Sequence, residues 1–213
     1  MFTGLVQHLG TVERVEPSPA GRRLWVSLGS WSHRPDLGAS ISVSGCCLTV
    51  AERRVSPEGG VEAVRFDAVH HTLAVTTLGG IEAGEAVNLE PSATPSTLLG
   101  GHLVQGHVDE IGRVISVSTA GGEWRVRIAV SAAFEPLLVA RGSVAVAGVS
   151  LTVAELGEGW FEVVLIPETL ERTTLKALAS GDPVNLEGDC LAKMVARMLE
   201  SRLAAAADQS PMA

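Results

Sequence analysis

The sequence predicts an all-β protein built from two copies of one small barrel, followed by an amphipathic α-helix. Three blocks of sequence occur twice, in the same order in both halves of the chain. Each copy holds five to six short β segments punctuated by Gly, Pro and Ser. Small closed antiparallel barrels fit copies of about 95 residues, and closure removes exposed sheet edges. We therefore expect a first barrel over residues 1–97, a second over 98–188 and a helix over 189–207.

The central repeated block is a predicted strand with a glycine near its middle. Residues 38–50 read GASISVSGCCLTV, and residues 141–153 read RGSVAVAGVSLTV. Apolar and small polar residues alternate in both blocks, which is typical of a strand, and the glycine indicates a bend or a close approach. The alignment places Cys47 opposite Ser150. Both copies thus carry a small side chain with a potential nucleophile or hydrogen-bonding atom.

Two further blocks flank this strand in each copy. Residues 3–15 align with 105–117, and both read as glycine-interrupted strands suited to a curved sheet. Residues 71–90 align with 168–187, with ten identities in twenty positions. Their shared TLxxTTL pattern predicts a short helical stretch. The joint between the copies is expected near residues 91–101, which are rich in Pro, Ser and Thr.

The C-terminal segment has a different periodicity. Its apolar residues recur at helical spacing, and Asp189 is placed to cap the start of the helix. Such a stripe must be buried either on the chain's own barrels or against the same helix of other subunits. We favour self-association. The residues of this stripe are Leu191, Met194, Val195, Met198, Leu199 and Leu203.

Composition excludes several classes of function. The net charge of -8 and the lack of a Lys and Arg cluster argue against a nucleic-acid partner. Cys46, Cys47 and Cys190 match neither a disulfide framework nor a zinc-binding spacing. The sequence shows no signal peptide and no apolar run of the roughly 18 residues that a membrane span needs. We therefore expect a soluble cytoplasmic protein with no membrane association.

The duplication suggests that each barrel holds one copy of the same ligand. Backbone groups beside Gly4 and Gly106, with the hydroxyls of Thr49 and Thr152, suit a flat polar ring, although threonines in strands are most often structural. Cys47 is the best nucleophile by residue type, but a buried strand cysteine acting as a small apolar residue is more common.

The histidines are weighed in the same way. His102 and His107 lie five residues apart, on opposite faces of a strand, and His70 and His71 are adjacent, so we expect no shared metal site. Either His102 or His107 is a candidate general base, and a structural histidine is the commoner alternative.

The chain resembles a known enzyme family at several separate motifs. These are MFTGLV, SGCCLTV, GGHLVQGHVD, AGVSLTV, IPETLERTTL and VNLEGDCLAKMVARML. Together they closely resemble riboflavin synthase of the alpha-chain type, which has two lumazine-binding repeats. The likeness runs from Met1 to about Leu203.

The resemblance implies two six-stranded Greek-key barrels and a C-terminal helix that gathers three chains into a homotrimer. It implies that two molecules of 6,7-dimethyl-8-ribityllumazine exchange a four-carbon unit, giving riboflavin and a pyrimidinedione, without metal or organic cofactor. The active site would lie between the first barrel of one subunit and the second barrel of its neighbour. Whether the chain associates with lumazine synthase, and which barrel holds the donor, stay open.

The resemblance also assigns site residues. The catalytic or near-catalytic candidates are Ser40, Cys47 and His102, with Phe2 at the edge of the site. The first pocket is expected to use Gly4, Leu5, Val6, Cys47, Leu48, Thr49, Asp67, Ala68, Val69, His70, His71 and Thr72. The second is expected to use Gly106, His107, Val108, Arg141, Ser150, Leu151, Thr152, Val164, Leu165, Ile166, Pro167, Glu168 and Thr169, with Asp189 reaching in from the helix start.

Three positions depart from the family pattern. Arg141 stands in place of a lysine, Ala147 in place of Asp or Asn, and His71 in place of a glutamate that Glu168 keeps in the second repeat. The alternative function is a non-catalytic lumazine or flavin carrier, which needs one good pocket and is free to lose the second signature. Because VSLTV and PETLERTTL are retained in the second repeat, we favour the enzyme.

Overall fold

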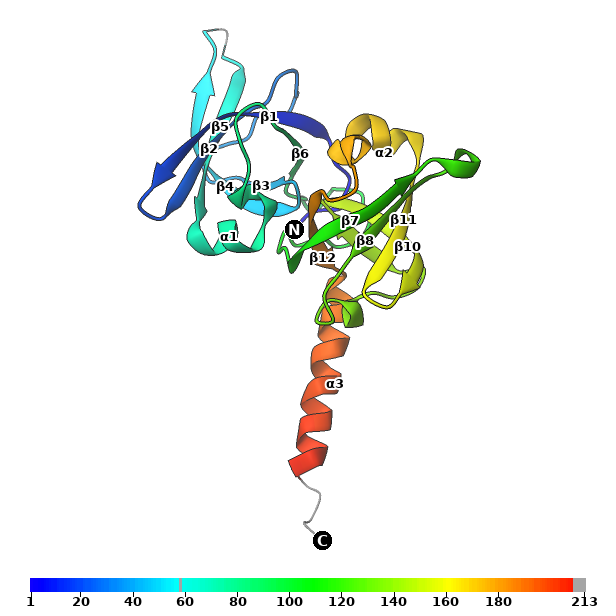
Figure 1. Ribbon diagram of the computed structural model, residues 1–213. Coiled ribbons are helices and arrows are strands. Elements are labelled where there is room, and N and C mark those ends of the chain that lie inside the picture. The colour runs from blue at the N-terminus through cyan, green and yellow to red at the C-terminus, as the bar shows by residue number, and fades with distance from the viewer. Residues whose placement is uncertain (58, 209–213) are drawn as a thin grey trace.

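A computed structural model describes residues 1–57 and 59–208. It consists of two closed six-stranded antiparallel barrels and a long C-terminal helix (Figure 1), as the sequence predicts. The first barrel comprises β1 (His8–Ser18), β2 (Gly21–Ser27), β3 (Ser40–Val43), β4 (Cys46–Val55), β5 (Val61–Val69) and β6 (Ala86–Pro91). The second comprises β7 (Glu110–Ser118), β8 (Trp124–Ala129), β9 (Ser143–Val146), β10 (Val149–Gly157), β11 (Trp160–Leu165) and β12 (Pro183–Gly188).

Both barrels have the same strand order. In the first it is β1-β2-β5-β4-β3-β6, and in the second the corresponding strands follow one another in the same way. The strands β3, β4 and β5 are neighbours in sequence and in the sheet, and β6 returns to pair with β3. Three consecutive strands with a fourth beside the first form a Greek key. The Greek-key barrels implied by the resemblance are therefore present.

Alternating residues form the barrel cores. In β4, Leu48 and Val50 point inward and are buried, whereas Thr49 between them is exposed. The register of β4 against β5 shifts between Val50 and Glu52, and β10 shifts against β11 between Val153 and Glu155. A bulge bends its strand, so the same device curves both sheets at the same point.

Short helices close one end of each barrel. Helix α1 (His70–Val75) and the 3-10 turn η1 (Thr77–Gly79) follow β5, whereas α2 (Pro167–Arg172) and η4 (Thr174–Ala177) follow β11. Two further 3-10 turns, η2 (Ala120–Gly122) and η3 (Glu135–Leu137), occur in the second barrel and have no counterpart among the described residues of the first. The helical stretch predicted at TLxxTTL is confirmed in both repeats.

Two asparagines join the barrels. The amide of Asn88 donates to Ala147 O (2.9 Å) and its oxygen accepts from Thr174 N (2.8 Å). Asn185 does the same in reverse, donating to Ser44 O (2.7 Å) and accepting from Thr77 N (2.7 Å). Both are almost fully buried. This reciprocity makes the interface pseudo-two-fold.

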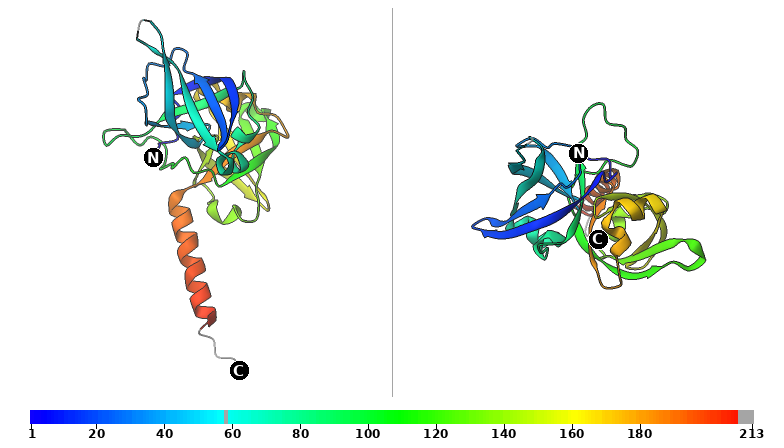
Figure 2. Two further views of the ribbon diagram at one scale, coloured as in Figure 1. Left: turned by 90° about the vertical axis from the view of Figure 1, so that its left-hand side faces the viewer. Right: turned by 90° about the horizontal axis from the view of Figure 1, so that it is seen from above.

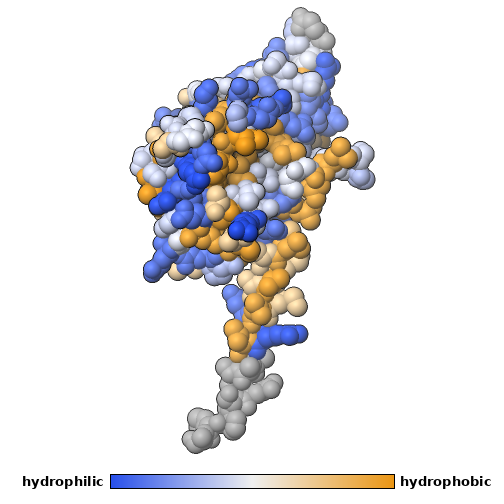
Figure 3. Space-filling model, turned by 90° about the vertical axis from the view of Figure 1, so that its right-hand side faces the viewer, coloured by the Kyte–Doolittle hydropathy of each residue, from blue (hydrophilic) through white to orange (hydrophobic). Residues whose placement is uncertain are grey.

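Helix α3 (Cys190–Asp208) extends away from both barrels (Figures 1 and 2). The predicted cap is confirmed, because Leu191 N donates to Asp189 Oδ1 at 2.9 Å. Every residue of the predicted apolar stripe, from Leu191 to Leu203, is more than half exposed, and apolar side chains follow the visible side of the helix in Figure 3. The stripe is thus not buried on the chain's own barrels. Among the residues described, no helix is long and apolar enough to cross a membrane.

Candidate functional site

A cavity of about 300 Å³ opens on the outer side of the second barrel. One wall is the backbone segment 4–6, and the opposite walls come from the start of β10 and from α2 with the residues around it. We call this the second pocket. Its lining residues are Gly4, Leu5, Val6, Val149, Ser150, Ile166, Glu168, Thr169, Arg172 and Thr173.

A histidine lies behind this pocket. His102 Nδ1 is 2.7 Å from Ser150 Oγ, and the ring is 8% exposed. Burial lowers the pKa of His102 below 6.5, and the charge of Asp189 opposes that shift only in part. The imidazole is therefore neutral near pH 7, with one nitrogen free of a proton. A neutral imidazole hydrogen-bonded to a hydroxyl that lines a pocket is suited to general acid–base work.

The segments around Gly4 and Gly106 lie on the barrels opposite to those expected. Ser150 N of the second barrel donates to Gly4 O at 2.8 Å, and Val6 packs against the second core. Cys47 N of the first barrel donates to Gly106 O at 2.8 Å, and Val108 packs against the first core. We call residues 3–6 and 105–108 the first and second straps. We expected the first strap to share a pocket with Cys47 and the second with Ser150, whereas each strap lies against the barrel of the other repeat.

The first barrel presents a matching wall made of Cys47 and the second strap. The side chain of Cys47 is half-buried and lies on the outer face of β4, whereas Cys46 is buried. Burial raises the pKa of the Cys46 thiol to about 12, so this thiol stays protonated. Of the adjacent pair, only Cys47 is placed to meet a ligand. The repeat alignment pairs this wall with the second pocket, Cys47 standing where Ser150 stands.

Comparison with known proteins identifies the fold and the repeats. The family model described as "Lumazine binding domain" matches residues 3–92 and again 105–189. The chain belongs to the lumazine-binding domain family. It is 41% identical over 204 residues to riboflavin synthase of Mycobacterium tuberculosis, covering 94% of this chain and 99% of the relative. It is 36% identical over 209 residues to riboflavin synthase of Escherichia coli, covering 96% and 94%.

Solved structures agree with this assignment. The crystal structure of LumP complexed with riboflavin matches with a TM-score of 0.75 and 26% identity, covering 88% of this chain and 99% of that one. The structure of LumP with 6,7-dimethyl-8-(1'-D-ribityl) lumazine matches with a TM-score of 0.74 and 23% identity, over the same shares of the two chains.

Some of the predicted lumazine-site residues face the barrel interiors. Leu48, Leu151, Ala68 and Leu165 are buried and belong to the two cores, so only their backbones can border an external ligand. Thr49 and Thr152 are exposed on the outer faces, and Ser40 pairs with Thr49 across the β3–β4 hairpin. Val164 is half-buried, and Asp67 is exposed, within 3.7 Å of Arg23 and 3.8 Å of Arg65.

The short helices form the rims of the pockets. Val69 and Ile166, at the ends of β5 and β11, are 48% and 61% exposed and offer apolar contact. Pro167 and Glu168 begin α2, where Glu168 is ion-paired with Arg172, whereas His70 and His71 begin α1 and are exposed. His107 is exposed on the second strap. Thr72 and Thr169 are half-buried at matching positions.

Phe2 lies at the barrel interface. It is 1% exposed, and its backbone pairs with Val104. A Cβ added at Gly106 would meet the Phe2 ring at 2.8 Å. The Phe2 ring thus packs against the second strap at Gly106. It does not line the second pocket.

Arg141 and Asp189 do not line the second pocket. Asp189 lines a groove beside α3 with Ser143, Leu191 and Val195, and the exposed Arg141 precedes Gly142 of the same groove. Arg141 has a φ of 65°, where its repeat counterpart Gly38 has 80°. A non-glycine residue is unusual there and carries a conformational cost. Neither residue borders the second pocket of its own chain.

Sequence reasoning missed the residues that fix the straps. Glu90 and Glu187 are 3% and 2% exposed and accept hydrogen bonds from the strap backbones. The cavity also involves Val149, Arg172 and Thr173, which were not among the predicted residues. The repeated VNLE was the available signal, since two polar residues within a buried strand need specific partners.

Proposed function

We propose that the protein is a riboflavin synthase. Two molecules of 6,7-dimethyl-8-ribityllumazine react, one giving a four-carbon unit to the other. The acceptor becomes riboflavin, and the donor becomes 5-amino-6-ribitylamino-2,4(1H,3H)-pyrimidinedione. The observation that carries this proposal is the duplicated pocket wall, in which both repeats keep the strap, the small side chain of Cys47 or Ser150 and the helical rim.

The residues at the pockets fit the chemistry of this reaction. It needs a base for the acidic C7 methyl of one lumazine and a nucleophile at C7 of the other. His102 is neutral and hydrogen-bonded to Ser150, so it can take up a proton through that hydroxyl. Cys47 or a water molecule supplies the nucleophile, with Ser40 two positions along the same hairpin face. Holding the two partners in fixed orientation converts a bimolecular step into an effectively unimolecular one.

The two reacting pockets belong to different copies of the chain. The second pocket is lined by the second barrel and the first strap, and none of its lining residues comes from β1 to β6. The wall that carries Cys47 is a separate site. We infer that the lumazine facing the second pocket is held by the first barrel of another copy of the chain. The exposed apolar stripe of α3 supports assembly, and we infer a homotrimer in which the first barrel of one subunit faces the second barrel of the next. In this arrangement Arg141 and Asp189 serve a neighbour's site.

The cellular setting is part of the same proposal. Three free thiols suit a reducing compartment, which supports a cytoplasmic location. Association with lumazine synthase, which would supply the substrate, remains a prediction to be checked by co-elution of the two purified proteins.

The test is to mix the purified protein with 6,7-dimethyl-8-ribityllumazine, without added metal or cofactor, and to follow the products by absorbance and chromatography. Riboflavin and pyrimidinedione in equal amounts are expected. Tight lumazine binding without product would instead indicate a carrier, the alternative that the retained second repeat disfavours.

A further inference from the structure

Two buried carboxylates hold the straps in place. Glu90 accepts hydrogen bonds from Thr3 N (2.6 Å), Thr3 Oγ1 (2.8 Å) and Gly4 N (3.0 Å). Glu187 accepts from Gln105 N (2.7 Å), Gly106 N (2.9 Å) and His107 N (3.0 Å). Charge-assisted bonds to buried carboxylates are strong and directional. Each strap thus donates three hydrogen bonds to a single carboxylate.

Each carboxylate belongs to the barrel opposite the pocket that it serves. Glu90 lies on β6 of the first barrel, but the strap that it holds forms a wall of the second pocket. Glu187 lies on β12 of the second barrel, but its strap contacts Cys47 of the first. The two barrels therefore exchange pocket walls.

The strap backbones pack tightly against the pocket residues Ser150 and Cys47. Gly4 and Gly106 have φ values of 76° and 78°, and a Cβ added at either would come within 2.5 Å of Ser150 Cβ or 2.6 Å of Cys47 Cβ. Backbone this close to a pocket residue transmits any displacement of its anchor.

We propose that Glu90 and Glu187 are positioning residues acting across the barrel interface, Glu90 for the second pocket and Glu187 for the first. This inference rests on the proposed function, because it assumes that both pockets bind the same class of flavin or lumazine ring.

The experiment measures riboflavin binding to each pocket separately, by fluorescence quenching of the full-length protein. Thr169→Trp fills the second pocket, and Thr72→Trp fills its repeat counterpart, so each variant reports the pocket that is left. Glu90→Gln keeps the shape of the side chain but turns an amide towards the strap N–H groups. It is expected to weaken riboflavin binding about tenfold in the Thr72→Trp background and to leave binding unchanged in the Thr169→Trp background. Glu187→Gln should give the reverse pattern.

The crossed pattern separates positioning from general damage. A merely structural role would weaken both pockets equally, or the pocket on the barrel that carries the residue, and either result would overturn the proposal. If Glu90→Gln does not fold, Thr3→Val removes one donor of the same strap and must show the same crossed preference. Wild-type protein that binds no riboflavin would contradict the proposed function itself, an outcome distinct from a loss of the crossing.

Discussion

The two barrels share their internal supports and differ at the surfaces that meet other molecules. Asn88 and Asn185 make the same pair of interface bonds, and the two buried glutamates hold equivalent straps. At the pocket walls, by contrast, Cys47 stands opposite Ser150, and the exposed His71 and half-buried Val75 of α1 correspond to the ion pair of Glu168 and Arg172 on α2.

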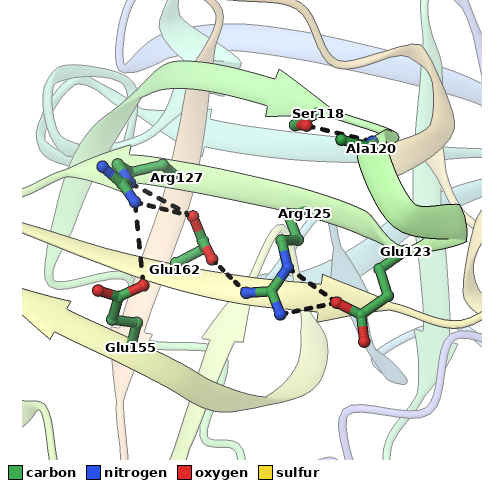
Figure 4. Close-up of polar contacts among 7 residues, drawn as sticks. All are labelled: Ser118, Ala120, Glu123, Arg125, Arg127, Glu155 and Glu162. Carbon is green, nitrogen blue, oxygen red and sulfur yellow. Dashed lines mark hydrogen bonds and ion pairs between the residues drawn. The ribbon is translucent and has the colours of Figure 1, made fainter.

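The two barrels differ in the sign of one charged residue that pairs with its neighbours on the barrel wall, at matching positions of β5 and β11. In the second barrel the buried Glu162 binds Arg125 at 2.7 Å and Arg127 at 3.2 Å, as Figure 4 shows. In the first barrel the same position is Arg65, which lies 3.3 Å from Glu52 and 3.8 Å from Asp67. The scaffold accepts either sign as long as the central charge is paired.

The duplicated residues therefore fall into a group that supports the fold and a group that lines the pockets. Residues at the pseudo-two-fold interface are held fixed because each must satisfy a partner in the other copy. Pocket residues such as Cys47 and Ser150 differ between the repeats, which fits the proposed reaction of one donor with one acceptor lumazine.

The largest effect is expected where the barrels are alike. Asn88→Ala leaves the half-buried Thr174 N and the buried Ala147 O without their partner, which should lower the free energy of unfolding by about 2–4 kcal/mol. Chemical denaturation measures it. The matched variant Asn185→Ala should lower the free energy of unfolding by a similar amount. A large difference between the two variants would show that the two barrels are not equivalent at their interface.

The next effect concerns the pockets, where the barrels differ. Cys47→Ser gives the first barrel the side-chain type of the second, and we expect turnover to fall at least tenfold, since a hydroxyl is a poorer nucleophile than a thiol. Lumazine binding should be retained, as equilibrium titration would check. Unchanged turnover would assign Cys47 to packing.

The adjacent thiols offer a control on that interpretation. Cys46 is buried with a pKa of about 12, so an alkylating reagent near pH 8 should modify Cys47 and spare Cys46. Mass spectrometry of the digested protein locates the label. Equal labelling of both residues would show that Cys46 becomes exposed to solvent when β4 separates from its neighbours. It would contradict the assignment of Cys46 to the core and Cys47 to the outer face.

A smaller effect is expected from acidification. Burial lowers the pKa of His102, so the folded protein resists protonation while the unfolded chain takes up a proton as the pH falls through 6.5. The stability contributed by the neutral ring is complete above that pH and is lost on going below it. His102→Gln should therefore show a shallower decline in unfolding temperature between pH 6.5 and about 5 than the wild type. Identical slopes would contradict the assigned neutral state.

The smallest effect is expected from the ion pairs of Glu162 on the wall of the second barrel. Glu162→Gln removes the central charge between Arg125 and Arg127, but both arginines are more than a third exposed and water can solvate them. The unfolding temperature should fall by less than half of the change seen for Asn88→Ala. A loss as large as that of the interface variant would show that this charge network has a role in folding.

Sequence reasoning predicted the repeats, the barrels, the helix and its cap, because each depends on local periodicity. It missed the exchange of straps, because alignment of repeats tells which residues correspond and not which copy they touch. Gly4 was grouped with Cys47 by its repeat, whereas its carbonyl meets Ser150. Glu90 and Glu187 were visible as identities, but only the fold shows their donors on the opposite strap.

In the proposed function, the two reacting lumazines occupy pockets of different chains. The most direct test is to co-express Thr72→Trp and Thr169→Trp under separate affinity tags and to isolate oligomers that carry both. Each variant alone should be inactive, because one of its two pockets is filled. Every mixed trimer has one interface in three that joins two intact pockets, so about a third of wild-type turnover should return. Doubly tagged oligomers with no recovered turnover would contradict a site shared between subunits.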